Sequence, residues 1–229
     1  LLFWCVCLNR LGEFDEAVAV GRQCLATNPE DPDVYLALAE ALRHTQQLEH
    51  AKANVRHALL LCPEHDTENN TDNSNNLAEG EVPSTHCHEK RGEAYEILGH
   101  IASSEGELEA ACEYFKQALE SDPTLVRVHA HWGQALLKAG QTAEALAHIR
   151  QAHDADPENP DILLLWASVA MKEDAVDEAL GKLFSLAEDD AWNPRLNFLL
   201  GSHYLEAGEY EKAATALQHT LDSSPHHID

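Results

Sequence analysis

The stretch from Ala94 to Thr124, AYEILGHIASSEGELEAACEYFKQALESDPT, decides the fold. It contains two segments in which apolar residues recur at helical spacing. Gly106 permits a positive φ and ends the first segment, and Pro123 cannot continue the second. Gly99 and Ala111 are small residues, one on each segment, and they allow the two helix axes to approach closely. The stretch therefore predicts two antiparallel helices joined by a short turn.

The same pattern recurs along the whole chain. One alanine of each second helix keeps a common register, with a spacing of 34 residues except at one step: Ala17, Ala51, Ala111, Ala145, Ala179 and Ala213. Twelve residues before each alanine stands a small residue, and the residue before that one is large and apolar. Glycine precedes the alanine by five residues in four copies, and proline follows it by twelve in five copies. A constant period of about 34 residues indicates one repeated helix–turn–helix unit. No stretch alternates long enough for a strand, so the prediction is an all-α chain.

This pattern resembles the tetratricopeptide repeat (TPR) family. The motif is also carried by LGSHYLEAGEYEKAATALQHTLDSSP, from Leu200 to Pro225, and the resemblance covers the chain outside residues 64–90. It implies a single right-handed superhelical solenoid of antiparallel helix pairs over residues 1–229, with twelve helices. The six repeats are expected at residues 1–31, 32–63, 92–125, 126–159, 160–193 and 194–227.

Between repeats two and three the period is stretched from 34 to 60 residues, an insertion of 26. Residues 64–90 are rich in Asn, Asp, Glu, Ser and Thr and almost lack large apolar side chains, which predicts an acidic, Asn-rich mobile loop. A group of His and Cys residues in and beside this segment offers thiolate and imidazole ligands for zinc: Cys62, His65, His86, Cys87 and His88. Their spacing matches no standard ligand set, so we predict neither a metal site nor a cofactor.

Composition restricts the partners. The chain has 40 acidic and 15 basic residues and a net charge of −25, which argues against nucleic acid and anionic membranes as ligands. The acidic residues are spread over all repeats, as expected for a solvated face or for adaptation to high salt. No run of 18 apolar residues is present, so no membrane insertion is predicted.

Cysteine usage and the chain's first residues bear on localisation. Six cysteines without a framework pattern favour a reducing compartment and a cytoplasmic location, with the periplasm as the alternative if an upstream signal was removed. The sequence lacks an initiator Met, and its first repeat lacks three positions, so we expect a fragment or a processed product.

The sequence contains no recognisable catalytic motif: no Gly-rich phosphate loop, no His-Glu-x-x-His and no Gly-x-Ser-x-Gly. We therefore predict a protein that is not an enzyme. The resemblance implies that function lies on the concave face, which the first helix of each repeat lines. Some TPR proteins grip a peptide's C-terminal carboxylate with Lys and Asn on this face. The two positions of each repeat that correspond to these clamp residues hold neither Lys nor Asn in this sequence, so this clamp is not predicted.

The charges on this predicted face divide into two halves. The face of repeats one to three, which includes Glu93, Glu96 and His100 of repeat three, sums to −2, and that of repeats four to six sums to +2 in a chain of −25. The second half also carries apolar residues, and we predict a partner-binding groove formed by Arg127, His131, Lys138, Leu164, Leu165, Met171, Lys172, Arg195, Phe198 and Leu199. Such a groove suits a protein or peptide that bears acidic and apolar residues. The alternative is that these apolar residues pack between neighbouring first helices.

Two functions follow as candidates. The first is a non-catalytic scaffold or adaptor that binds a peptide or helix in its concave groove. The second is the repeat segment of a larger enzyme, such as a sulfotransferase or glycosyltransferase, in which the repeats position substrate or mediate self-association. The apolar residues at both ends of the sequence also predict self-association through uncapped helices.

Overall fold

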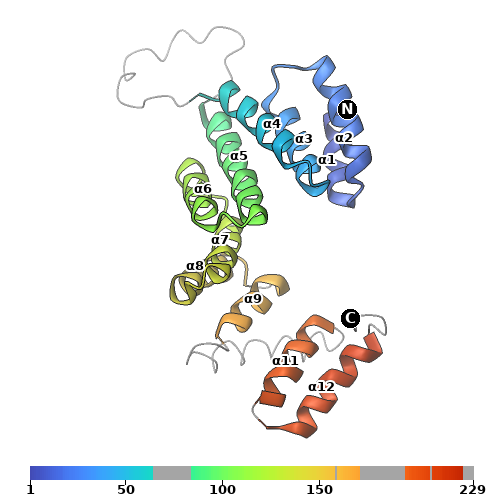
Figure 1. Cartoon of the computed structure of the whole chain (residues 1–229), viewed down its shortest axis with the longest axis vertical. Coiled ribbons are helices and arrows are strands. Elements are labelled where there is room, and N and C mark those ends of the chain that lie inside the picture. The colour runs from blue at the N-terminus through green and yellow to red at the C-terminus, as the bar shows by residue number, and fades with distance from the viewer. Residues whose placement is uncertain (64–83, 158, 171–193, 207, 224–229) are drawn as a thin grey trace. The chain divides into compact units, whose positions relative to one another are not determined.

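A computed structural model of the chain describes residues 1–63, 84–157, 159–170, 194–206 and 208–223 (Figure 1). Every regular element in these ranges is an α-helix, which confirms the all-α prediction. The helices are α1 (Leu2–Leu11), α2 (Phe14–Thr27), α3 (Pro32–His44), α4 (Leu48–Leu61), α5 (Ser84–Glu105), α6 (Leu108–Ser121), α7 (Arg127–Lys138), α8 (Thr142–Ala155), α9 (Pro160–Ala170), α11 (Pro194–Glu206) and α12 (Tyr210–Ser223). The tenth predicted helix falls within residues 171–193, outside the described residues.

The chain divides into two compact units, Leu1–His131 and Trp132–Asp229. In the first unit, α1 packs on α2, α3 on α4 and α5 on α6, and successive pairs join through α2 with α3 and α4 with α5. The first helices also contact one another, α1 with α3 and α3 with α5. In the second unit α8 packs on α9, α9 on α11 and α11 on α12. These contacts within each unit are those of stacked helix pairs.

The turn between the two helices of a repeat adopts the backbone that the glycine column predicts. Gly12, Gly106, Gly140 and Gly208 all have φ between 76° and 82°. Gln46 occupies the same position in repeat two and also has a positive φ, 61°. The turn geometry is therefore kept even where the residue is not glycine, at the cost of a left-handed conformation that L-residues disfavour.

The small residues of the register lie at the helix crossings. Ala17, Ala51, Ala111 and Ala145 are completely buried. A Cβ atom built on Gly99 would lie 2.5 Å from Phe115 Cε1. The same crossing recurs in repeats four and six, where added Cβ atoms would meet the side chains of Ile149 and Leu217. In each case the helix facing the glycine carries the large side chain four residues after the register alanine.

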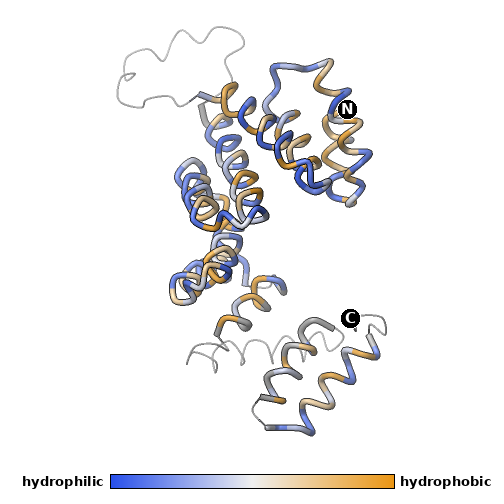
Figure 2. Tube along the Cα trace, viewed as in Figure 1, coloured by the Kyte–Doolittle hydropathy of each residue, from blue (hydrophilic) through white to orange (hydrophobic). Residues whose placement is uncertain are grey.

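The large apolar column packs between neighbouring repeats, as predicted. Leu38 of α3 lies against Gly21 of α2, and the Trp166 ring of α9 lies 4.8 Å from the His153 ring of α8. Trp4 differs, since 60% of it is exposed. Hydrophobic and hydrophilic segments alternate along the traces of the helices (Figure 2).

The prolines mark the helix ends. Pro29, Pro63, Pro123 and Pro157 each stand two residues after the last residue of α2, α4, α6 and α8. The predicted start of repeat three needs a correction, because α5 begins at Ser84 and not after Lys90. The Lys90 ammonium lies 2.7 Å from Asp33 Oδ1 and 3.2 Å from Glu93, so ion pairs anchor this turn where apolar residues are lacking. The rest of the predicted loop, residues 64–83, lies outside the described residues.

Among the described helices, none combines the length and the apolar character needed to cross a membrane. All six cysteines are free thiols in the structure, and Cys5, Cys24 and Cys62 are buried.

Candidate functional site

The first unit contains a cavity of about 650 Å³ on the side formed by the first helices of its repeats. Residues of α1, α3 and α5 line it, together with Arg127 at the start of α7. The concave face predicted for the first helices is therefore hollowed in this unit.

One part of the cavity wall is apolar. Leu2, Phe3 and Val6 of α1 line it beside Leu36 of α3 and Ile97 of α5. Leu36 and Ile97 are buried, whereas 82% of Phe3 is exposed. The wall therefore offers both a packed apolar floor and an aromatic ring that is open to solvent.

The charged part of the wall is mostly paired. Lys90 bridges Asp33 and Glu93, and Arg43 donates from Nε and Nη2 to the carboxylate of Glu40 at 3.1 and 2.6 Å. Arg10 also lines the cavity, is exposed, and has no ion pair with any described residue. It is a cation available to a carboxylate of a bound partner.

Asn9 adds a polar group to the same wall. Its Nδ2 donates to the Ala37 carbonyl at 2.8 Å and thereby links α1 to α3. Its buried Oδ1 finds no hydrogen-bond partner among the described residues.

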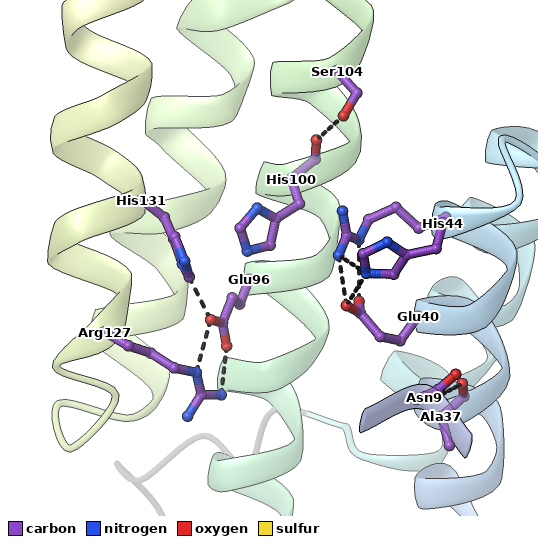
Figure 3. A network of polar contacts seen from close by, with 10 residues as sticks. Asn9, Ala37, Glu40, His44, Glu96, His100, Ser104, Arg127 and His131 are labelled. Atoms are coloured by element: carbon purple, nitrogen blue, oxygen red, sulfur yellow. Dashed lines mark hydrogen bonds and ion pairs between the residues drawn. The ribbon is translucent and has the colours of Figure 1, made fainter. Parts of the chain in front are cut away.

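A four-residue polar cluster lies where α5 meets the start of α7 (Figure 3). Arg127 donates from Nε and Nη2 to the two carboxylate oxygens of Glu96, at 2.9 and 2.6 Å. His131 Nδ1 lies 3.4 Å from Glu96 Oε1. The ring centroid of His100 is 4.3 Å from that of His131. We call Glu96, His100, Arg127 and His131 the α5–α7 cluster.

The cluster fixes the protonation of two of its members. Burial raises the pKa of Glu96, but the contact with His131 and the hydrogen bonds and charge of Arg127 outweigh it and lower that pKa to about 2. Burial, followed by the charges of His131 and Arg43, lowers the pKa of His100 to about 4, against the opposing effect of Glu96 and Glu40. At neutral pH Glu96 is therefore a carboxylate and His100 a neutral imidazole.

The residues of the predicted groove are placed unevenly. Arg127 and His131 come together in the α5–α7 cluster, so the charge of Arg127 is already paired with Glu96. Lys138 is exposed at the end of α7, Leu165 is half-buried on α9, and Phe198 is exposed on α11.

Five further residues of that groove have no described side chain. Leu164, Arg195 and Leu199 lie on α9 and α11, and Met171 and Lys172 lie outside the described residues. The groove of repeats four to six therefore stays a prediction.

Sequence reasoning placed Glu96 and His100 on the concave face but did not connect them with Arg127 and His131. The available signal was the spacing of four residues between Glu96 and His100, which puts both side chains on one helix face. The connection to Arg127 spans 31 residues, and it depends on how first helices of successive repeats face each other.

Models of the tetratricopeptide repeat match residues 8–60, 92–125 and 136–183, which together make up more than half of the chain. No curated protein sequence matches the chain significantly. Among solved structures, PilF of Pseudomonas aeruginosa has a TM-score of 0.71 at 17% identity, over 98% of this chain and 90% of that one. YrrB, described as a TPR protein with an unusual peptide-binding site, has a TM-score of 0.61 at 21% identity, over 90% and 93%. A thermophilic TPR protein of Thermus thermophilus has a TM-score of 0.62 at 22% identity, over 89% of this chain and 97% of that one.

At these identities the structures show the fold, and the matched repeats show the family. Both agree with the stacked helix pairs and with the buried alanines and turn glycines described above. Proteins built from these repeats are in general scaffolds for protein interactions. The chain therefore belongs to the tetratricopeptide repeat family.

Proposed function

We propose that this chain is a non-catalytic scaffold that binds an extended or helical segment of another protein along the first helices of its repeats. The cavity of the first unit is the observation that carries the proposal. Its apolar wall supplies the area that a peptide's side chains bury, and its polar groups supply orientation. The description of YrrB as a TPR protein with a peptide-binding site supports a peptide as the class of ligand.

The wall also indicates the chemistry of the bound segment. Phe3 and Val6 favour an apolar side chain, and the unpaired guanidinium of Arg10 favours a carboxylate near it. The acid groups of the wall are already held by Lys90, Arg43 and Arg127 and are less available to a partner. A segment with apolar and acidic residues therefore fits the cavity.

The set predicted on repeats four to six is a second surface for the same function. Its exposed members Lys138 and Phe198, with Lys172 and Arg195, would favour a similar apolar and acidic segment. The two surfaces lead to different mutational outcomes, so one experiment distinguishes them.

The experiment selects peptides from a random display library on the full chain and measures the affinity of the selected peptide by fluorescence anisotropy. Phe3→Asp and Arg10→Glu test the cavity, and Lys172→Glu with Arg195→Glu tests the second surface. The matched controls are Leu60→Asp and Arg22→Glu, because both residues are exposed and lie outside the cavity.

We expect the cavity variants to weaken binding at least about tenfold, which is the loss of about 1.4 kcal/mol, while the controls bind like the parent chain. Loss in the Lys172 and Arg195 variants alone would place the segment on repeats four to six. If no peptide binds better than its scrambled version, the scaffold proposal is wrong.

A further inference from the structure

The α5–α7 cluster brings three metal-ligating side chains together. Glu96, His100 and His131 each offer one ligand atom, and these atoms lie within 4.8 Å of one another. Glu96 and His100 come from one face of α5, four residues apart, and His131 comes from α7 (Figure 3). No other group of three such residues in the described parts of the chain meets this condition.

We propose that Glu96, His100 and His131 form a binding site for a divalent transition-metal ion, for which Zn²⁺ has the best-matched chemistry. A carboxylate with two imidazoles is a ligand set that zinc takes in proteins, where three protein ligands leave a fourth position open. Glu96 and His100 also line the cavity, so a water molecule reaches that fourth position from the cavity side.

The distances suit a tetrahedral ion. Zinc bonds to nitrogen and oxygen are about 2.0–2.1 Å, so neighbouring ligands of a tetrahedron lie about 3.3 Å apart. Glu96 Oε1 and His131 Nδ1 are already 3.4 Å apart. A rotation that draws the His100 ring inward by about 1–1.5 Å completes three ligands at this spacing.

The hydrogen bonds leave the required lone pairs free. A carboxylate has about four acceptor sites, and Arg127 uses one on each oxygen of Glu96. The second acceptor site on Glu96 Oε1 can therefore bind an ion that lies beside His131. His131 Nδ1 is buried and makes no hydrogen bond with the described residues beyond its 3.4 Å contact with Glu96 Oε1, so an ion between these two atoms would give it a closer partner.

Arg127 has a defined role in such a site. It holds the Glu96 carboxylate in place, as outer partners of metal-ligating carboxylates do. Its charge and that of Arg43 lower the affinity for a cation, and Glu40 and Glu93 of the same cavity offset part of this effect. The ion pair alone does not account for the cluster, because Arg127 satisfies Glu96 without either imidazole.

The test is a titration of the full, reduced chain with Co²⁺, followed by visible absorption, and then competition with Zn²⁺. We expect one tetrahedral Co²⁺ per chain that Zn²⁺ displaces. Glu96→Gln, His100→Gln and His131→Gln are each expected to weaken binding by at least about tenfold. A thermal unfolding curve, monitored by circular dichroism, checks that each variant is folded.

The matched control is His44→Gln. His44 and Glu40 stand four residues apart on α3, as His100 and Glu96 do on α5, and they lie 3.2 Å apart. Arg43 is bound to Glu40, much as Arg127 is bound to Glu96. No third ligating side chain among the described residues joins His44 and Glu40. Its binding should equal that of the parent chain. Cys62→Ser tests the thiol at the end of α4, and Cys87→Ser tests the thiol near the start of α5.

Two results would overturn the proposal. One is the absence of a tetrahedral Co²⁺ spectrum in the parent chain. The other is binding that shows sulfur-to-cobalt charge transfer and is lost in Cys87→Ser but kept in His131→Gln, which would place the ion at the thiols.

Discussion

Arg127 and Glu96 form a two-point contact that joins the first helices of repeats three and four. Nε and Nη2 of the guanidinium reach both carboxylate oxygens, and Glu96 is buried while 57% of the Arg127 side chain is exposed. A bidentate pair of this kind is directional as well as charged. It therefore sets the relative orientation of α5 and the first turn of α7.

A double-mutant cycle measures this contact. We expect Glu96→Gln and Arg127→Gln to show a coupling free energy of about 1 kcal/mol, at the low end for charged hydrogen bonds because water screens the half-exposed Arg127. Urea unfolding of the four proteins gives the value. Replacing Lys116, whose pair with Glu120 is exposed and 3.8 Å apart, should show a coupling near zero. Equal couplings for the two pairs would contradict a special role for Glu96.

The left-handed residue of repeat two offers a stabilising change. Gln46 has φ 61°, where glycine stands at the equivalent turn of repeats one, three, four and six. Gln46→Gly should raise the free energy of unfolding by about 0.5–1 kcal/mol, since glycine adopts this backbone without steric cost. Thermal and urea unfolding measure the gain. The reverse change, Gly140→Gln, should lose a similar amount, and a loss of stability on Gln46→Gly would show that the Gln46 side chain has an unrecognised role.

The repeat register could be predicted because each of its marks has a local cause. A positive φ favours glycine, a helix end tolerates proline, and a close crossing accepts only a small side chain. Gln46 shows the limit of this reasoning, since the backbone follows the repeat and not the residue. The start of α5 at Ser84 was missed because ion pairs of Lys90, and not an apolar periodicity, secure its first turns.

The candidate site was harder to predict for a different reason. The repeat register predicts that Glu96, His100 and Arg127 lie on the concave side of their helices. It does not predict which residue of the next repeat a long side chain on that side contacts. Arg127 was counted as a free cation of the groove, whereas it is bound to Glu96. The cavity depends on such pairings between repeats, which only the three-dimensional structure shows.

The crossing of α5 and α6 should not tolerate a methyl group at Gly99. A Cβ there would lie 2.5 Å from Phe115 Cε1, and the Phe115 side chain is buried. Gly99→Ala gains about 1 kcal/mol of helix propensity, but overpacking costs about 1–3 kcal/mol, so we expect a net loss of stability. Phe115→Leu in the same chain makes room for the methyl group. The added cost of Gly99→Ala should therefore be smaller in the Phe115→Leu background, and an equal cost in both would place the strain elsewhere.

Cys62 should be the least reactive of the thiols near the insertion. It is buried at the end of α4, and burial, followed by the neighbouring Cys87, raises the pKa of its thiol to about 12. The thiolate is the nucleophile, so the raised pKa leaves little of the reactive form of Cys62 at pH 8 in the folded chain. Iodoacetamide labelling and peptide mass mapping should find Cys87 and Cys112, which are only half-buried, labelled well before Cys62. In urea the difference should vanish, because unfolding removes the burial that causes it. If Cys62 and Cys87 react at equal rates in the folded chain, the end of α4 opens readily, and the contact between Arg91 and the Cys62 carbonyl at 3.2 Å does not hold it closed.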